Sequence, residues 1–97
     1  MEPLKPIHYV ITRGLFQAGQ KDPEVEKAYI EAMKQFNRGE WGLLGQEDIQ
    51  ANDEDLAARD GHVLGKYATP AGMIYINLEF HDTEPEDLAC IMFCSEY

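Results

Sequence analysis

The fold of this chain is decided by residues 62–80, which read HVLGKYATPAGMIYINLEF. Two runs with strand signals, 62–68 and 73–80, flank the turn Thr69-Pro70-Ala71-Gly72. Runs of this length joined by a short turn with Pro and Gly are typical of a β-hairpin. A third such run, residues 88–93, follows after an acidic turn. The pattern therefore predicts an antiparallel meander in the C-terminal part of the chain.

The N-terminal part predicts one strand and then helices. Residues 7–11 (IHYVI) are β-branched and aromatic, which favours a strand. Asp22 followed by Pro23 is a typical helix start, because Asp caps the first free N–H groups and Pro suits the first helical position. The expected helical segments are a short turn over 15–18 ended by Gly19, a helix over 23–37, and a helix from Gln46 or Asp48 to Arg59.

Together these elements predict a single α+β domain over residues 1–97. We expect a three- to four-stranded antiparallel sheet, made of the N-terminal strand plus the meander and packed by two or three helices on one face. No apolar run approaches the about 20 residues of a membrane span, and the N-terminus has no signal-peptide core. The expected location is therefore the cytoplasm, where Cys90 and Cys94 are expected to be free thiols.

The negative charge is concentrated in one part of the chain. Residues 1–39 carry six Lys or Arg and five acids, whereas residues 40–97 carry two basic and thirteen acidic side chains. The second part thus has a net charge of −11, and the whole chain −10. Such a field repels nucleic acids and anionic membrane surfaces and attracts basic surfaces. The expected partner is a basic protein, with no direct nucleic-acid or membrane binding.

The chain resembles a family of small plasmid- and phage-encoded proteins of unknown function, sometimes called plasmid-related proteins. The family pattern includes Gly-Asp-Trp-Gly, Asp-x-x-x-Asn and a terminal Glu-Tyr. The residues that carry the resemblance are Thr12, Ala18-Gly19, Gly39-Glu40-Trp41-Gly42, Asp48, Asn52, Leu56, Gly61, Tyr67, Gly72, Ile74, Ile76, Glu79, Asp82 and Glu96-Tyr97. The chain departs from the family at Glu40, Leu43, Thr83 and Cys94. The resemblance implies a setting on mobile elements and no known activity.

Charge and resemblance together predict a non-enzymatic acidic protein that inhibits or masks a basic, nucleic-acid-binding host defence protein. Carboxylates in the second long helix and the last turn would imitate the phosphates of DNA, and a CRISPR effector or a nuclease is the expected target. An anti-CRISPR role is the most specific form of this prediction. The expected contact residues are Trp41, Glu47, Asp48, Glu54, Asp55, Glu84, Glu86 and Asp87.

Three alternatives stay open. The first is a small regulatory or antitoxin-like subunit that binds through an apolar patch around Trp41 and Leu43, although packing of Trp41 onto the core is the more frequent role for such a residue. The second is a cation-binding accessory protein with oxygen ligands. The third is an accessory protein with no fixed partner. The candidate cation ligands are Asp48, Asn52, Glu79 and Asp82.

No residue pattern predicts catalysis, a metal site or a cofactor. His8, His62 and His81 are far apart in the sequence and form no spaced ligand pair. Ser95 is the only serine, and neither cysteine has the surroundings of an activated thiol. We therefore expect no enzymatic activity.

Overall fold

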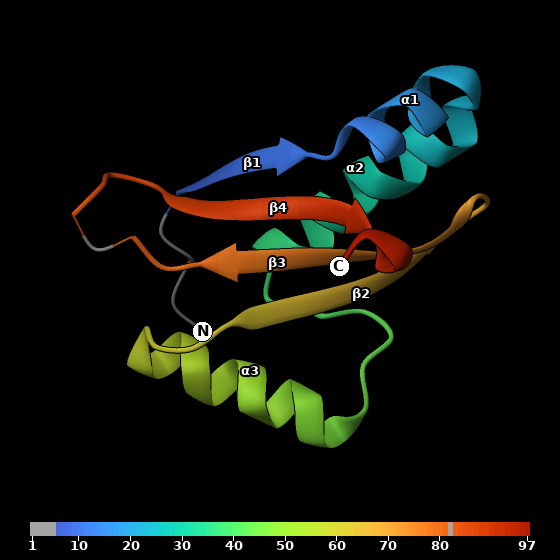
Figure 1. Cartoon of the computed structure of the whole chain (residues 1–97). Coiled ribbons are helices and arrows are strands. Elements are labelled where there is room, and N and C mark those ends of the chain that lie inside the picture. Colours follow the sequence, from blue (N-terminus) through green and yellow to red (C-terminus); the bar gives the residue numbers. More distant parts are fainter. Residues whose placement is uncertain (1–5, 82) are drawn as a thin grey trace.

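The computed structural model describes residues 6–81 and 83–97. Three α-helices and a four-stranded sheet form an α+β fold (Figure 1), which confirms the predicted fold class. The elements are β1 (Ile7–Ile11), α1 (Arg13–Lys21), α2 (Pro23–Asn37), α3 (Gln46–Ala58), β2 (Val63–Thr69), β3 (Gly72–Glu79), β4 (Asp87–Phe93) and the short 3₁₀ turn η1 (Cys94–Glu96). No helix within the described ranges is long and apolar enough to cross a bilayer.

The sheet has the order β1-β4-β3-β2. The meander is present, since β2 pairs with β3 and β3 with β4, both antiparallel. At the predicted turn, the Thr69 hydroxyl accepts from the Ala71 N–H at 3.1 Å and donates to the Gly72 carbonyl at 2.7 Å. These two bonds fix the sharp reversal of the chain.

The expected antiparallel placement of β1 is corrected, because β1 pairs with β4 in parallel. The helices between β1 and β2 return the chain to the end of the sheet at which β1 began, so β1, β2 and β4 all run in one direction (Figure 1). A helical connection of this kind is the usual link between strands that run the same way in one sheet.

The helices agree with the predictions in two cases and differ in one. Helix α2 begins where Asp22 was expected to cap it, and the Asp22 carboxylate accepts from the Glu24 N–H at 3.0 Å. Helix α3 ends one residue before Arg59. Helix α1 is longer than the predicted turn and continues through Gly19. A Cβ atom at Gly19 would lie 2.8 Å from the Tyr29 ring, so this glycine serves the close packing of α1 on α2.

Within the described ranges, α-helices cover only one face of the sheet. Alternate residues of all four strands point to this face, where they pack against α1, α2 and the segment before α3. In Figure 1, α2 lies behind the sheet, and η1 is the one described helical element in front of it. The largest fully buried side chains are Phe36, Leu15, Ile74, Ile76, Leu78, Ile91, Val25 and Val63.

Candidate protein-binding surface

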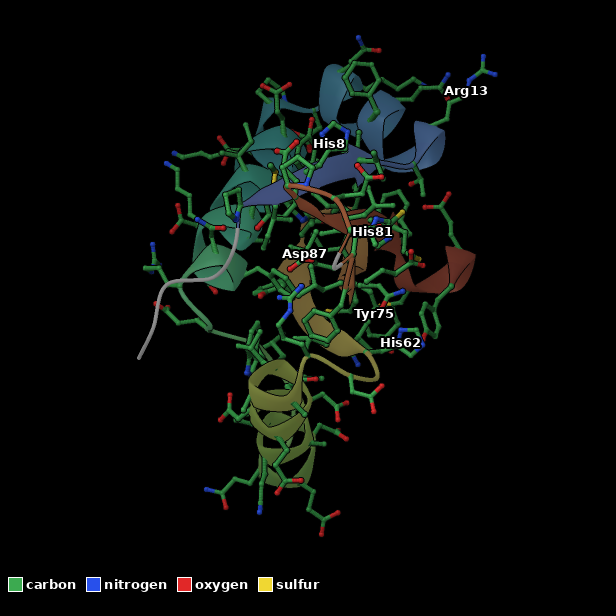
Figure 2. All side chains as sticks on the ribbon, turned by 90° about the vertical axis from the view of Figure 1, so that its left-hand side faces the viewer. His8, Arg13, His62, Tyr75, His81 and Asp87 are labelled. Carbon is green, nitrogen blue, oxygen red and sulfur yellow. The ribbon has the colours of Figure 1, made fainter. Side chains whose placement is uncertain are left out.

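Helix α3 presents most of its acids to solvent. Glu47 and Asp48 occupy its first turn, where carboxylates interact favourably with the positive end of the helix dipole. Glu54 follows Glu47 by seven residues and Asp55 follows Asp48 by seven, so each pair lies on one side of the helix, about 10 Å apart along its axis. Figure 2 shows α3 extending away from the rest of the molecule.

The side of α3 opposite Glu47 and Glu54 is held on the edge of β2, and Asp48 and Asp55 flank this side. Ile49 and Leu56 pack on the core, and Asn52 is buried between them. The Asn52 side chain donates to the Leu64 carbonyl at 2.7 Å and accepts from the Leu64 N–H at 3.1 Å. An amide group thus occupies the position that a neighbouring strand would take. Its placement fixes which side of α3 faces solvent.

Trp41 lies in the core and not on the surface. Its side chain is 3% exposed and meets the Phe36 ring edge-on, with 5.1 Å between ring centroids. Its indole N–H donates to the Asp53 carboxylate at 3.0 Å, which ties the loop to α3. The expectation that Trp41 contacts a partner is therefore corrected. Burial is favourable here because the ring packs against Phe36 and the indole N–H has a hydrogen-bond acceptor.

Leu43 remains as the exposed apolar residue of this loop, with 61% of its surface accessible. It lies at a groove of about 270 Å³ between α2 and β2. The neighbouring backbone is fixed, because the Leu43 N–H donates to the Lys66 carbonyl at 2.8 Å and the Lys66 N–H donates to the Trp41 carbonyl at 3.0 Å. Glu40 also steadies the loop through an exposed ion pair with Arg38 at 2.6 Å, which lowers the pKa of the Glu40 carboxyl.

Asp87 is likewise not available to a partner. It is 3% exposed and accepts two hydrogen bonds from the Arg59 guanidinium, at 2.9 and 3.1 Å, and one from the His81 N–H at 2.9 Å. The expectation that Asp87 is a surface contact charge is corrected for this reason. A buried carboxylate requires such partners, because unpaired charge is costly away from water.

The Arg59–Asp87 pair brings two acidic segments together. Arg59 follows the last residue of α3, and Asp87 follows the loop that carries Glu84 and Glu86. The C-terminal end of α3 and this loop therefore meet at one end of the molecule, which faces the viewer in Figure 2, whereas Glu47 and Asp48 lie at the other end of the helix. We define the acidic surface by its seven side chains, of which Asp55 is partly exposed and the others are exposed: Glu47, Asp48, Glu54, Asp55, Asp60, Glu84 and Glu86.

The three histidines also gather at this end, which their sequence separation did not predict. His8 and His81 line a groove of about 300 Å³ beside the 84–86 loop, and His62 lines a second groove of about 240 Å³. The His81 imidazole lies 3.5 Å from the Glu79 carboxylate. Figure 2 shows His8, His62, His81 and Asp87 at this end.

The candidate cation ligands are not brought together. Both polar atoms of Asn52 are engaged with Leu64, and Asp48 and Glu79 are exposed on different elements. Asp82 lies outside the described residues. Among residues 6–81 and 83–97, no group of three His, Cys, Asp or Glu side chains is placed to hold a metal ion.

The two cysteines are free and partly buried. Burial, with smaller contributions from Glu96 and Glu79, raises the pKa of the Cys90 thiol, so its reactive thiolate form is disfavoured. Cys94 belongs to η1 rather than to the strand.

Comparison of the chain with protein-family models, with curated proteins and with solved structures found no significant match in any of the three.

Proposed function

We propose that this protein is a non-enzymatic acidic binding protein that docks its acidic surface on a basic surface of another protein. One observation carries the proposal: the carboxylates of α3 and of the 84–86 loop are exposed, apart from the partly exposed Asp55, and Arg59, which joins the two segments, is paired internally with Asp87. The negative field is therefore directed outward rather than cancelled. Such a field steers association with a cationic groove.

The proposed partner is a nucleic-acid-binding protein of a bacterial host's defence system, and its most specific form is a CRISPR effector in the cytoplasm. The spacing of the α3 carboxylates supports this. Glu47 and Glu54 lie about 10 Å apart along the helix axis, which equals about three phosphate steps of one DNA strand. The resemblance to proteins of mobile elements adds the setting in which such an inhibitor is useful.

The test is competition with DNA for purified CRISPR effector–guide complexes and defence nucleases, read by anisotropy of a labelled target duplex. We expect the protein to displace DNA at about 50 mM salt and to lose most of this ability at about 300 mM, because exposed charges are screened. The double reversal Glu47→Lys/Glu54→Lys should weaken competition by about tenfold or more.

The chain offers a matched control on α2. Glu24 and Glu31 are exposed and also seven residues apart, so Glu24→Lys/Glu31→Lys changes the net charge by the same amount on another helix. The control should compete nearly as well as the unmodified protein. If both variants lost competition equally, the effect would depend on overall charge and not on α3. If the unmodified protein competed at low salt with none of the tested effectors and nucleases, the proposal of a defence-protein partner would be wrong.

An apolar mode is the second candidate, because Leu43 is exposed beside the groove between α2 and β2. Apolar anchoring depends little on salt. Binding that survives high salt and is lost with Leu43→Ala, but not with the α3 reversals, would favour the regulatory-subunit alternative.

A further inference from the structure

Within the described part of the chain, the backbone of β1 is paired on one side and open on the other. The Asp87 N–H donates to the Pro6 carbonyl and the Thr12 N–H donates to the Ile91 carbonyl, both at 3.0 Å. Because backbone groups alternate in direction along a strand, His8 and Val10 also point toward β4. The N–H and C=O groups of Ile7, Tyr9 and Ile11 therefore point away from the sheet.

The two borders of the sheet are treated differently. At β2, the outward groups of Leu64 and Lys66 are satisfied by the Asn52 amide and by the segment 41–43. At β1, no helix or strand of the described chain lies along the outer edge (Figure 1). The paired register of β1 contains no bulge, no Pro and no Lys, which are the features that usually protect a free edge.

We propose that β1 pairs with β1 of a second copy of this chain, antiparallel about a two-fold axis at Tyr9. In this register Tyr9 lies opposite the partner's Tyr9, and Ile7 lies opposite the partner's Ile11. All outward-pointing residues then fall in hydrogen-bonded pairs, which no shifted symmetric register achieves over this strand length. The two sheets become one continuous sheet.

The side chains beside this edge suit such an interface. Val10 is 38% exposed on the open face of the sheet, where the register places it opposite the partner's His8. On the helix side, Ile30 is 41% exposed and lies one turn before Met33, whose carbonyl is the acceptor at 3.5 Å for the Tyr9 hydroxyl. This side of α2 thus flanks β1, and pairing would cover apolar surface on both faces of the sheet.

The charge distribution permits pairing with a second copy at β1, because this arrangement keeps the two acidic helices apart. Helix α3 lies at β2, the border opposite β1. Pairing at β1 therefore places the two acidic helices at the far ends of the dimer, beyond the screening length of about 10 Å. The segments next to the interface come mainly from residues 6–39, a part of the chain with nearly balanced charge. The 84–86 loop also lies there, because it lines one groove together with His8.

The register is tested by cross-linking in a Cys90→Ala/Cys94→Ala background. His8 and the partner's Val10 form a non-hydrogen-bonded pair, with Cα atoms about 4.5 Å apart, a separation that a disulfide can span. A mixture of His8→Cys and Val10→Cys chains in a glutathione buffer should form a covalent heterodimer, whereas either variant alone should not. Cross-linking equal in all three samples, or absent from the mixture, would overturn the proposed register.

Association itself is tested by light scattering on the full chain over a concentration series, with circular dichroism to check folding. His8→Lys/Val10→Lys places like charges opposite each other and should weaken the dimer by about tenfold, whereas His8→Lys/Val10→Glu should restore it. Both double variants change the same two exposed positions, so a difference in dimerisation between the folded variants reports on the contact between position 8 and the partner's position 10. A monomer up to about 1 mM, or equal dimerisation of the two variants, would contradict the proposal.

Discussion

At the scale of single residues, Arg59 organises the acidic end of the molecule. It follows α3 in a left-handed conformation with φ of 52°, which few non-glycine residues adopt. From there its guanidinium reaches Asp87 and lies 5.0 Å from the centroid of the Phe80 ring. The forked geometry of Arg suits both contacts, which a lysine could not make together.

We predict that Arg59→Gln lowers the free energy of unfolding by about 1–3 kcal/mol, because Asp87 would stay buried with its main partner lost. The larger cost of breaking a fully buried pair does not apply, since the Arg59 side chain is 33% exposed. Gln keeps an L side chain at the positive φ, so the backbone cost is unchanged. Urea unfolding measures the loss, and adding Asp87→Asn should cost less than the sum of the single changes.

At the scale of elements, α3 depends on one polar contact for its place on the sheet. The helix has no side-chain N-cap and a thin apolar side, and Asn52 is its one buried residue. The two hydrogen bonds from Asn52 to Leu64 join the helix to the edge of β2. The same contact blocks that edge against pairing with another chain.

We predict that Asn52→Asp destabilises the protein by about 1–3 kcal/mol, because the carboxylate can no longer donate to the Leu64 carbonyl. Chemical unfolding gives the magnitude, and hydrogen exchange should show faster exchange in α3 than in the β3–β4 pair. Gln46→Glu adds the same charge to the exposed first position of α3 and should change stability by less than about 0.5 kcal/mol. Equal effects of the two changes would mean that added charge, and not the lost donor, is responsible.

At the scale of the whole molecule, the fold separates a nearly neutral helical half from an acidic end. Helices α1 and α2 come from the balanced part of the sequence, and α3 and the 84–86 loop come from the acidic part. The core lies between sheet and helices, where Tyr67 is buried and Tyr9 is partly buried against it. Tyr67 donates to the Glu40 carbonyl at 2.7 Å.

These tyrosines predict how stability depends on alkaline pH. Burial raises the pKa of Tyr9 from 10.0 to about 12, and burial followed by the charges of Tyr9 and Glu40 raises the pKa of Tyr67. The unfolded chain therefore loses these protons first, so their contribution to stability is complete below pH 10 and is lost as the pH rises through the folded-state values. Tyr9→Phe should reduce the slope of stability between pH 10 and 12 in urea titrations.

Much of the secondary structure could be predicted because it depends on residues a few positions apart. The capping of α2 by Asp22 and the turn from Thr69 to Gly72 are local interactions, and the structure contains both. The exposed acids of α3 are also visible in the sequence, because its helical spacing leaves a single narrow side for the core. The long form of α1 was missed, since Gly19 serves contact with Tyr29 and not termination.

The sequence by itself determined the elements, the charge asymmetry and the acidic side of α3. Only the tertiary structure decided that β1 runs parallel to β4, that Trp41 and Asp87 are buried, and that β1 keeps an open edge. These features depend on contacts between residues far apart in the chain, such as Arg59 with Asp87, which are 28 positions apart. Local propensity carries no information on such contacts, because a contact between distant residues contributes to stability only after the fold has brought the two segments together.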